Sequence, residues 1–204
     1  MKRISVYLLA VLCILSGNVI ADDTNSTKDL YVGLNVLGAK THFDYSYSNS
    51  DETSTADFSS SGFQITYGAL LVYDLRLQGY FQYEVFDGQI FPDTTGDMLY
   101  EVGIDLIKSF PVSHSFFPFV KSGLGISLIP GSLADMGEPA LDAKLGAGII
   151  FKASESIELL GGLDYVLRKW KDQERVETLF GSNKGSLQAY DTSLRYYVGI
   201  NYLF

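Results

Sequence analysis

Apolar and polar side chains alternate with a period of two along residues 193–204. One parity is wholly apolar or aromatic: Leu194, Tyr196, Val198, Ile200, Tyr202 and Phe204. The other parity is mostly polar or small: Ser193, Arg195, Tyr197, Gly199, Asn201 and Leu203. Because successive side chains of a strand point to opposite faces, the pattern predicts a strand with one apolar face. Its length is close to the ~9–11 residues that cross a membrane, although the last strand of a soluble sandwich would also alternate.

The same alternation recurs in seven further segments. It predicts strands at residues 30–36, 63–73, 77–85, 98–106, 118–128, 141–152 and 157–168. Short turns near residues 75, 112 and 154 alternate with long loops near residues 50, 92, 135 and 178. This asymmetry is typical of up-and-down barrels in the outer membrane. The pattern therefore predicts an all-β fold, an eight-stranded antiparallel up-and-down transmembrane β-barrel.

The position of the charges indicates which face of the barrel is outside. A soluble lipocalin-type barrel also has eight strands, but its apolar face lines the interior. Here charged side chains take the parity opposite to the apolar one in nearly every predicted strand. Charges packed into a soluble core would be costly. We therefore expect the apolar face to meet lipid, and a sheet in lipid must close because an open edge would leave backbone groups unpaired.

Seven charged residues take the inward parity and form the predicted interior network: Glu84, Glu101, Asp105, Lys121, Lys144, Asp164 and Arg195. Counted from the short turns, Asp105 and Lys121 lie in a lower layer and the other five in an upper one. Side chains fill the interior of an eight-stranded barrel. The prediction is a plug of ion pairs in which Arg195 offsets the upper carboxylates; a narrow ion path is the alternative.

The N-terminus has the features of a cleavable secretory signal. Lys2 and Arg3 precede an apolar run over residues 4–15, and small residues come before Asp22. We expect cleavage after Ala21, which divides the chain into a signal peptide (1–21) and a barrel domain (22–204). Loss of the two basic residues takes the net charge from −9 to −11, which disfavours nucleic acid as a partner. The single cysteine, Cys13, lies within the predicted signal.

Several segments carry a resemblance to a known family. They are the strand 31–35 (Tyr-Val-Gly-Leu-Asn), the glycine-rich segments 122–125 and 145–148, and the C-terminal residues 196–204. With these features the chain resembles the small eight-stranded outer-membrane barrels, which include the barrel domain of outer membrane protein A and the opacity-type adhesins. The resemblance covers the whole chain after the predicted signal.

The resemblance implies a location and partners. It implies export to the outer membrane of a Gram-negative bacterium and contact with outer-membrane lipid and lipopolysaccharide. It also implies that the barrel-assembly machinery reads the last strand through Tyr202 and Phe204, and that the barrel is a monomer. The expected role is structural or surface-interacting, as in adhesins. The alternatives are a narrow porin-like channel and a lipid A-modifying enzyme.

Residues suited to catalysis are scarce. A lipid A deacylase on a similar barrel uses a His-x-Ser arrangement, but the residue two places after His114 is Phe116. His42 and Asp44 begin the first predicted loop, and no cluster of His, Cys or carboxylates suggests a metal. The expectation is a protein that is not an enzyme and has no cofactor or metal. The glycine pairs 123/125 and 146/148 are expected to make room for large neighbours inside the barrel.

The long loops are the predicted contact surface. The loop over residues 41–61 carries Phe43, Tyr45, Tyr47 and Phe58, and the loop over residues 169–185 carries Lys169, Trp170, Lys171, Arg175 and Phe180. Aromatic residues provide contact area at low entropic cost. These side chains are therefore expected to be exposed and available to a partner.

Overall fold

The computed structural model describes residues 29–47, 53–91, 97–130, 138–176 and 184–204. The predicted signal peptide lies outside these residues. The elements are β1 (Leu30–Tyr47), β2 (Thr53–Leu70), the 3-10 turn η1 (Val72–Asp74), β3 (Leu75–Phe86), β4 (Met98–Ser109), β5 (Phe116–Ile129), β6 (Glu138–Lys152), β7 (Ile157–Trp170), β8 (Gln173–Val176) and β9 (Lys184–Leu203). Among the described residues, no helix has the length and hydropathy needed to span a membrane.

The sheet closes on itself as a barrel. Neighbouring strands from β1 to β7 pair antiparallel in chain order, and β9 pairs antiparallel with both β7 and β1. The short strand β8 pairs with β9 beyond the last β7 pair, so it extends the β7 side of the sheet. The eight barrel strands are therefore β1 to β7 and β9. This confirms the predicted eight-stranded antiparallel barrel.

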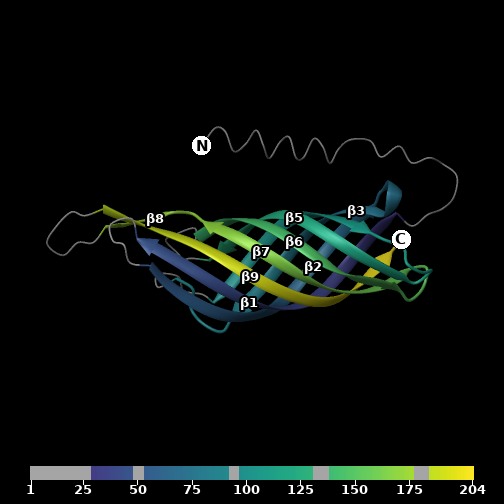
Figure 1. Ribbon diagram of the computed structural model, residues 1–204, viewed down its shortest axis with the longest axis horizontal. Coiled ribbons are helices and arrows are strands. Elements are labelled where there is room, and N and C mark those ends of the chain that lie inside the picture. Colours follow the sequence, from purple (N-terminus) through teal and green to yellow (C-terminus); the bar gives the residue numbers. More distant parts are fainter. Residues whose placement is uncertain (1–28, 48–52, 92–96, 131–137, 177–183) are drawn as a thin grey trace.

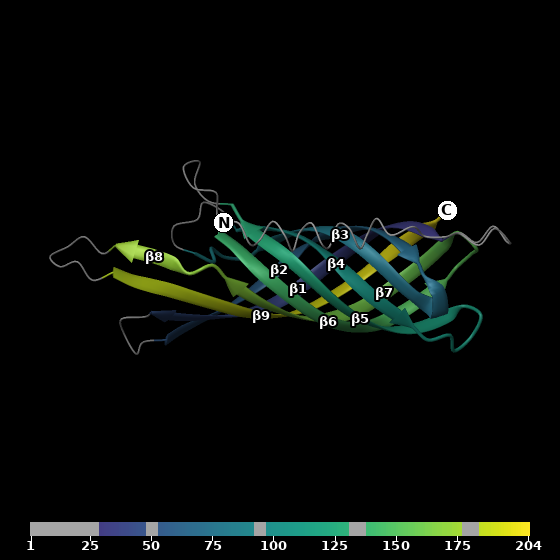
Figure 2. The ribbon, with the colours of Figure 1, turned by 90° about the horizontal axis from the view of Figure 1, so that it is seen from above.

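The strands wind obliquely around the barrel, whose two ends differ (Figures 1 and 2). One end, here called the turn end, holds the C-terminus and the short connections 71–74, 110–115 and 153–156. The opposite end, here called the loop end, is where β1, β3, β5 and β7 end and where β2, β4 and β6 begin. There β8 and the first residues of β9 project beyond the barrel wall.

The strands are longer at the loop end than predicted. Residues 41–61 were expected in a loop, but residues 41–47 belong to β1, residues 53–61 belong to β2, and the two segments pair with each other. The predicted loop over residues 169–185 likewise contains β8 and the start of β9. These boundaries were wrong because the outward face changes from apolar to polar at Lys40 while the backbone ladder continues. The end of the apolar alternation marks the edge of the apolar belt and not the end of the strand.

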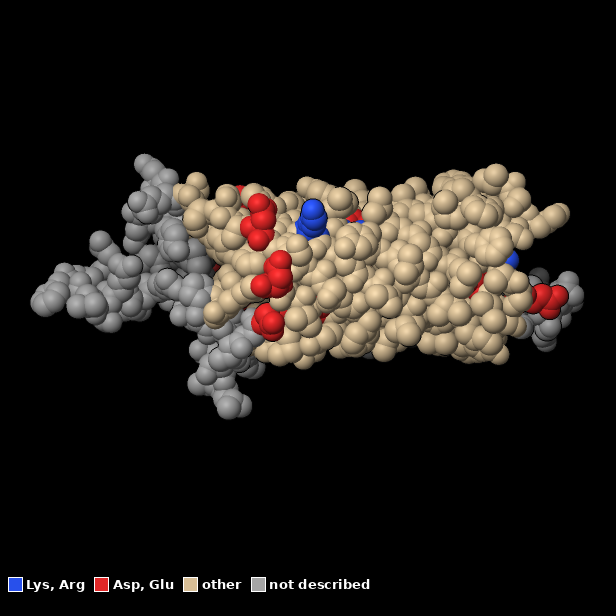
Figure 3. All heavy atoms as spheres, turned by 90° about the horizontal axis from the view of Figure 1, so that it is seen from below, with Lys and Arg blue, Asp and Glu red and all other residues tan. Residues whose placement is uncertain are grey.

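The apolar face is the outer one, as predicted. Val36, Leu124, Leu145 and Val198 are each more than 60% exposed although they lie in regular strands. On the face shown in Figure 3, the outer wall carries almost no charge over most of its length, and charged residues lie toward its ends. Such an apolar belt on a folded barrel is the surface that meets the hydrocarbon of a bilayer. We call it the lipid-facing belt.

Inside the barrel, many glycines lie across from a planar or polar side chain of the neighbouring strand. In eight cases an inward glycine lies directly opposite a larger inward side chain of the adjacent strand, which occupies the space of the missing Cβ. The pairs are Gly33 and Asn201, Gly68 and Tyr31, Gly103 and Tyr80, Gly123 and Asp105, Gly146 and Asp164, Gly148 and Phe119, Gly162 and Tyr197, and Gly199 and Asn35. The glycines thus make room for large neighbours, as the sequence predicted.

This matching predicts that an inward glycine tolerates no side chain where an outward glycine does. In Gly103→Ala the new Cβ would collide with the Tyr80 hydroxyl and the Leu124 carbonyl. We expect its free energy of unfolding to fall by about 1–3 kcal/mol. Gly79→Ala, on the outer wall where the nearest atom to a Cβ is 3.9 Å away, should stay within ~0.5 kcal/mol of wild type. Urea unfolding in lipid vesicles measures both, and equal losses would contradict the matching.

Candidate functional site

Charged residues are concentrated in the barrel interior. Twelve are buried among the described residues: the cations Arg76, Lys121, Lys144, Arg168 and Arg195, and the carboxylates Glu84, Glu101, Asp105, Asp142, Glu158, Asp164 and Asp191. All seven residues of the predicted interior network are in this set. The other five buried charged residues were not part of the predicted network. Asp142, Glu158 and Arg168 had the inward parity in predicted strands, whereas Arg76 and Asp191 lay beyond the predicted strand ends.

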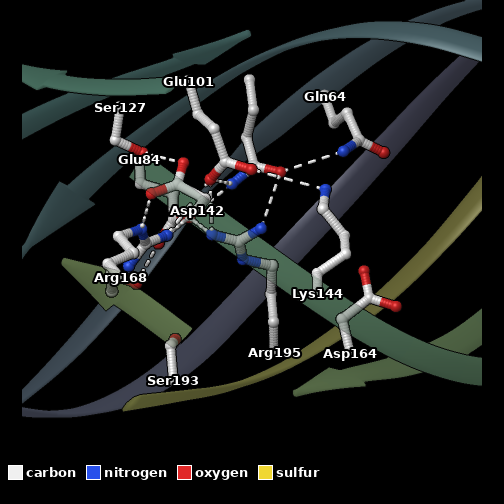
Figure 4. A network of polar contacts seen from close by, with 12 residues as sticks. Gln64, Glu84, Glu101, Ser127, Asp142, Lys144, Asp164, Arg168, Ser193 and Arg195 are labelled. Carbon is white, nitrogen blue, oxygen red and sulfur yellow. Dashed lines mark hydrogen bonds and ion pairs between the residues drawn. The ribbon is translucent and has the colours of Figure 1, made fainter. Parts of the chain in front are cut away.

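Two arginines bind the carboxylates of the upper interior. Arg195 Nη2 lies 2.7 Å from Glu84 Oε1 and 2.9 Å from Glu101 Oε2. Arg168 Nη2 lies 3.1 Å from the same Glu101 oxygen, and its Nη1 lies 3.1 Å from Asp191. Both guanidinium groups point into one cluster of carboxylates (Figure 4). Planar guanidinium groups suit this arrangement because each offers several donors in fixed directions.

Glu101 is the centre of this network. Its carboxylate accepts hydrogen bonds from Arg168, Arg195 and the Tyr80 hydroxyl, the last at 2.6 Å. Lys144 Nζ lies 3.4 Å from Glu101 Oε1 and 3.5 Å from Asp105 Oδ1. Lys144 therefore joins the upper cluster to the next carboxylate toward the turn end.

The lower interior holds three further ion pairs. Lys121 Nζ lies 2.7 Å from Asp164 and 3.9 Å from Asp105. Nearer the turn end, Arg76 makes a bidentate contact with Glu158, with hydrogen bonds of 2.6 and 3.0 Å. The sequence placed Asp164 at the level of Arg195. The two do face each other across the strands, but the ion pair of Asp164 is made with Lys121.

Apolar clusters separate and cap these ion pairs. Phe43, Phe91, Leu99 and Trp170 belong to a buried cluster at the loop end, where Trp170 Nε1 donates a 2.6 Å hydrogen bond to Asp191. A second cluster contains Leu37, Ile107, Phe119, Ile150 and Tyr197. The predicted exposure of Phe43 and Trp170 was therefore wrong. Their parity points inward because the strands continue past the lipid-facing belt, and there they close the barrel.

The two histidines lie outside the interior. His114 is in the turn after β4 and is exposed. His42 is exposed on β1 above the lipid-facing belt, where its Nδ1 lies 2.6 Å from Asp57 and its Nε2 lies 3.6 Å from Asp44. The hydrogen bond to Asp57 raises the pKa of His42 above its usual value. A His–Asp contact orients the base in many hydrolases, but no hydroxyl of the described residues hydrogen-bonds this imidazole.

Comparison with known proteins adds a result on the fold. No family model and no curated protein sequence matches the chain. Among solved structures, the outer membrane protein OprG of Pseudomonas aeruginosa superposes with a TM-score of 0.58 at 11% identity, over 86% of this chain and 96% of that one. The protein has the fold of a small outer-membrane β-barrel.

Other structures similar to this barrel are more distant in shape. Neisserial surface protein A covers 84% of the chain and 97% of its own, at 16% identity and a TM-score of 0.49. The attachment invasion locus protein Ail of Yersinia pestis covers 84% and 98%, at 11% identity and a TM-score of 0.37. These similarities concern the fold of the barrel and carry no assignment of a role.

The network predicts a large cost for removing Arg195. Arg195→Ala leaves the carboxylates of Glu84 and Glu101 buried with fewer positive partners, so we expect the free energy of unfolding to fall by about 3–5 kcal/mol. Lys171→Ala, at an exposed lysine, should change it by ~0–1 kcal/mol. Urea unfolding followed by Trp170 fluorescence measures both variants. Adding Glu84→Gln to Arg195→Ala should recover part of the loss, because members of one network are not additive.

The contact between His42 and Asp57 predicts a pH effect outside the belt. Because Asp57 raises the pKa of His42 in the folded barrel, this contact stabilises the fold fully below the unfolded pKa of about 6.5. The stabilisation is lost as the pH rises through the folded pKa. Asp57→Asn should lower the pKa of His42, measured by NMR titration of its imidazole with His114 as an internal reference. An unchanged titration curve would show that the hydrogen bond has no electrostatic effect.

Proposed function

We propose that the protein is a closed outer-membrane barrel with a structural and surface-interaction role, as in adhesins. The observation that carries this proposal is the series of buried apolar clusters and ion pairs inside the barrel. The aromatic cluster, the Arg168–Arg195–Glu101 network, the second apolar cluster and the Arg76–Glu158 pair follow one another from the loop end to the turn end. A barrel with these internal contacts holds the residues exposed at its two ends in a fixed arrangement.

The loop end supports the surface role. Above the belt, Lys40, His42, Asp44 and Asp57 face outward and are exposed, while Phe43 and its neighbours pack inside. Paired strands filled by an aromatic core form a rigid rim, and a rigid surface loses little entropy when a partner binds. This polar rim would be the part of the protein that contacts other molecules outside the cell.

The two alternative roles have less support. A narrow ion path would need a continuous line of water, but Lys121, Arg168 and Arg195 each lie 2.7–3.1 Å from a carboxylate oxygen inside the barrel. A lipid A-modifying enzyme would need a nucleophile or an activated water beside a base. His42 is the histidine nearest the outer lipid leaflet in the proposed orientation, and its two ring nitrogens face carboxylates.

The route to the membrane is also part of the proposal. Removal of residues 1–21 during export would leave residues 22–204 as a monomeric barrel. Tyr202 and Phe204 are about half exposed on the outer wall, with their rings stacked 6.3 Å apart. This exposed aromatic pair at the end of the last strand is accessible to the barrel-assembly machinery, and we assign it the role of assembly signal.

A conductance measurement tests the closed interior. The purified barrel, reconstituted in a planar bilayer at neutral pH, should show no discrete current steps, because the interior ion pairs leave no aqueous route. A large porin under the same conditions confirms that steps would be detected. Reproducible steps from the wild-type barrel would replace the plug with the channel alternative.

Surface labelling followed by adhesion tests the location and the role. In cells expressing Thr55→Cys, a membrane-impermeant maleimide should label the rim without cell disruption, whereas Val112→Cys in the turn after β4 should be labelled only after disruption. Bacteria expressing the barrel should adhere to an epithelial layer more strongly than vector controls. Thr55→Arg with Asp57→Arg should remove that gain; adhesion equal to the vector control in wild type would overturn the surface role.

A further inference from the structure

Strand β2 extends past its neighbour β3 at the loop end. Its pairing with β1 runs without a break to Thr53, but its pairing with β3 ends at Ser60. After β3 the chain turns inward, because Ile90 and Phe91 belong to the aromatic cluster at the loop end. Within the described ranges, residues 53–58 therefore pair with a strand on one side alone. We call their other side, which faces away from β1, the β2 edge.

Two contacts fix the direction of the backbone groups along β2. On the β3 side, Ser59 donates its N–H to the Asp87 carboxylate at 3.0 Å and accepts a bond from the Asp87 N–H at 2.9 Å. On the β1 side, the Leu70 N–H donates to the Asp29 carbonyl at 2.6 Å. Successive residues of a strand turn their N–H and C=O groups to opposite sides. Odd-numbered residues of β2 therefore bond on the β3 side and even-numbered residues bond to β1.

The odd-numbered residues Thr53, Thr55 and Asp57 thus present their N–H and C=O groups at the β2 edge. In the described part of the chain, no backbone group hydrogen-bonds to these groups. The edge lies above the lipid-facing belt, where water satisfies backbone groups and closure of the sheet is not required. It contains neither proline nor lysine, two residues with which proteins block the pairing of edge strands. Such an edge accepts an extended peptide through main-chain hydrogen bonds.

The charges beside the β2 edge are acidic. Asp57 lies on the edge with a side chain that is 85% exposed, and Asp87 and Asp97 are exposed on the side where an added strand would lie. Lys40 lies on β1, on the opposite side of β2. These carboxylates disfavour pairing with a second copy of the chain, which would bring two acidic rims together. They favour a strand that carries cations on its outer face.

The inner side of the edge is apolar. Ala56 and Phe58 have the inward parity and are half-buried. The Phe58 ring packs edge-on against the rings of Phe43 and Phe86. Alternate side chains of an added strand would contact this apolar surface, while the others would face the carboxylates outside. The edge thus fits a strand in which cationic and apolar residues alternate.

We propose that the β2 edge binds an extended cationic segment of another protein by antiparallel strand addition. Directly opposite residues of an antiparallel pair point to the same face of the sheet. The cationic residues of the partner would therefore lie opposite Thr53, Thr55 and Asp57 and exchange backbone hydrogen bonds with them. The apolar residues would lie beside Phe58. This partner class deepens the proposed surface role and rests on it.

Amide hydrogen exchange, followed by NMR of the purified barrel in detergent, tests the edge directly. The amides of Thr53, Thr55 and Asp57 should exchange at least about ten-fold faster than those of the even-numbered residues between them, which bond to β1. The probe is a peptide of about eight residues in which lysine and valine alternate, long enough to span the edge. Its addition should slow exchange at the three odd-numbered residues and leave the even-numbered ones unchanged.

A fluorescent form of the same peptide measures affinity by anisotropy. Methylation of the lysine backbone nitrogens removes the donors that would face the β2 edge, so it should weaken binding at least about ten-fold. Methylation of the valine backbone nitrogens, which would face away from the edge, is the matched control and should change the affinity less than about two-fold. All three peptides carry the same charge.

Variants of the barrel separate the backbone contribution from that of the side chains. Thr55→Pro removes one N–H of the edge and should weaken binding about five- to ten-fold, whereas Thr55→Val keeps this donor and should bind as wild type does. Asp57→Asn combined with Asp87→Asn should weaken binding about two- to five-fold, because the cations of the peptide lose their partners.

Three results would overturn the proposal. Equal affinity of the lysine-methylated and unmodified peptides, or of Thr55→Pro and wild type, would mean that charge attracts the peptide without strand addition. Slow exchange at Thr53, Thr55 and Asp57 before peptide is added would mean that the edge is already occupied, by a second copy if the protection rises with protein concentration. Binding is measured on purified barrel, so its failure is distinct from a failure of the surface labelling.

Discussion

Backbone hydrogen bonding inside hydrocarbon is the constraint on which the rest of the structure depends. Water is absent there, so every N–H and C=O group must find a partner within the protein. The pairing of β9 with β1 meets this requirement by removing both sheet edges. Closure at eight strands then leaves a narrow interior that side chains must fill. The inward glycines follow from that second requirement, because an interior of large side chains alone would not fit.

The charged interior is a consequence of the same closure. Lipid takes the apolar face, so the polar residues face inward, where carboxylates need cations close by. The network around Glu101 supplies them through Arg168, Arg195 and Lys144. Buried ion pairs cost desolvation and are weak sources of net stability. Their effect here is to fix side chains in one arrangement. Removing any one partner would lower the stability of the fold strongly, because it leaves a buried charge without its counterion.

The sequence predicted the faces of the strands better than their ends or their contacts. The parity of Val198 and Arg195 was sufficient to assign lipid and interior, because alternation reports which face is apolar. It could not locate the end of β1, since Lys40 and His42 end the apolar pattern while pairing with β9 continues. It therefore missed that Phe43 and Trp170 cap the interior. Ion-pair partners such as Lys121 and Asp164 depend on strand stagger and side-chain reach, which parity does not contain.

Access of a small reagent to the interior tests the closed barrel most directly. Ser193 is fully buried and Thr192, its neighbour on β9, faces outward above the belt. Single cysteines at these positions, in a folded barrel that lacks Cys13, can be treated with a charged methanethiosulfonate in lipid vesicles. A closed interior predicts rapid modification of Thr192→Cys and at least about a hundred-fold slower modification of Ser193→Cys, set by the rare opening of the fold. Modification of both cysteines at similar rates would mean that water and ions enter the barrel, and the account of a filled interior would be contradicted.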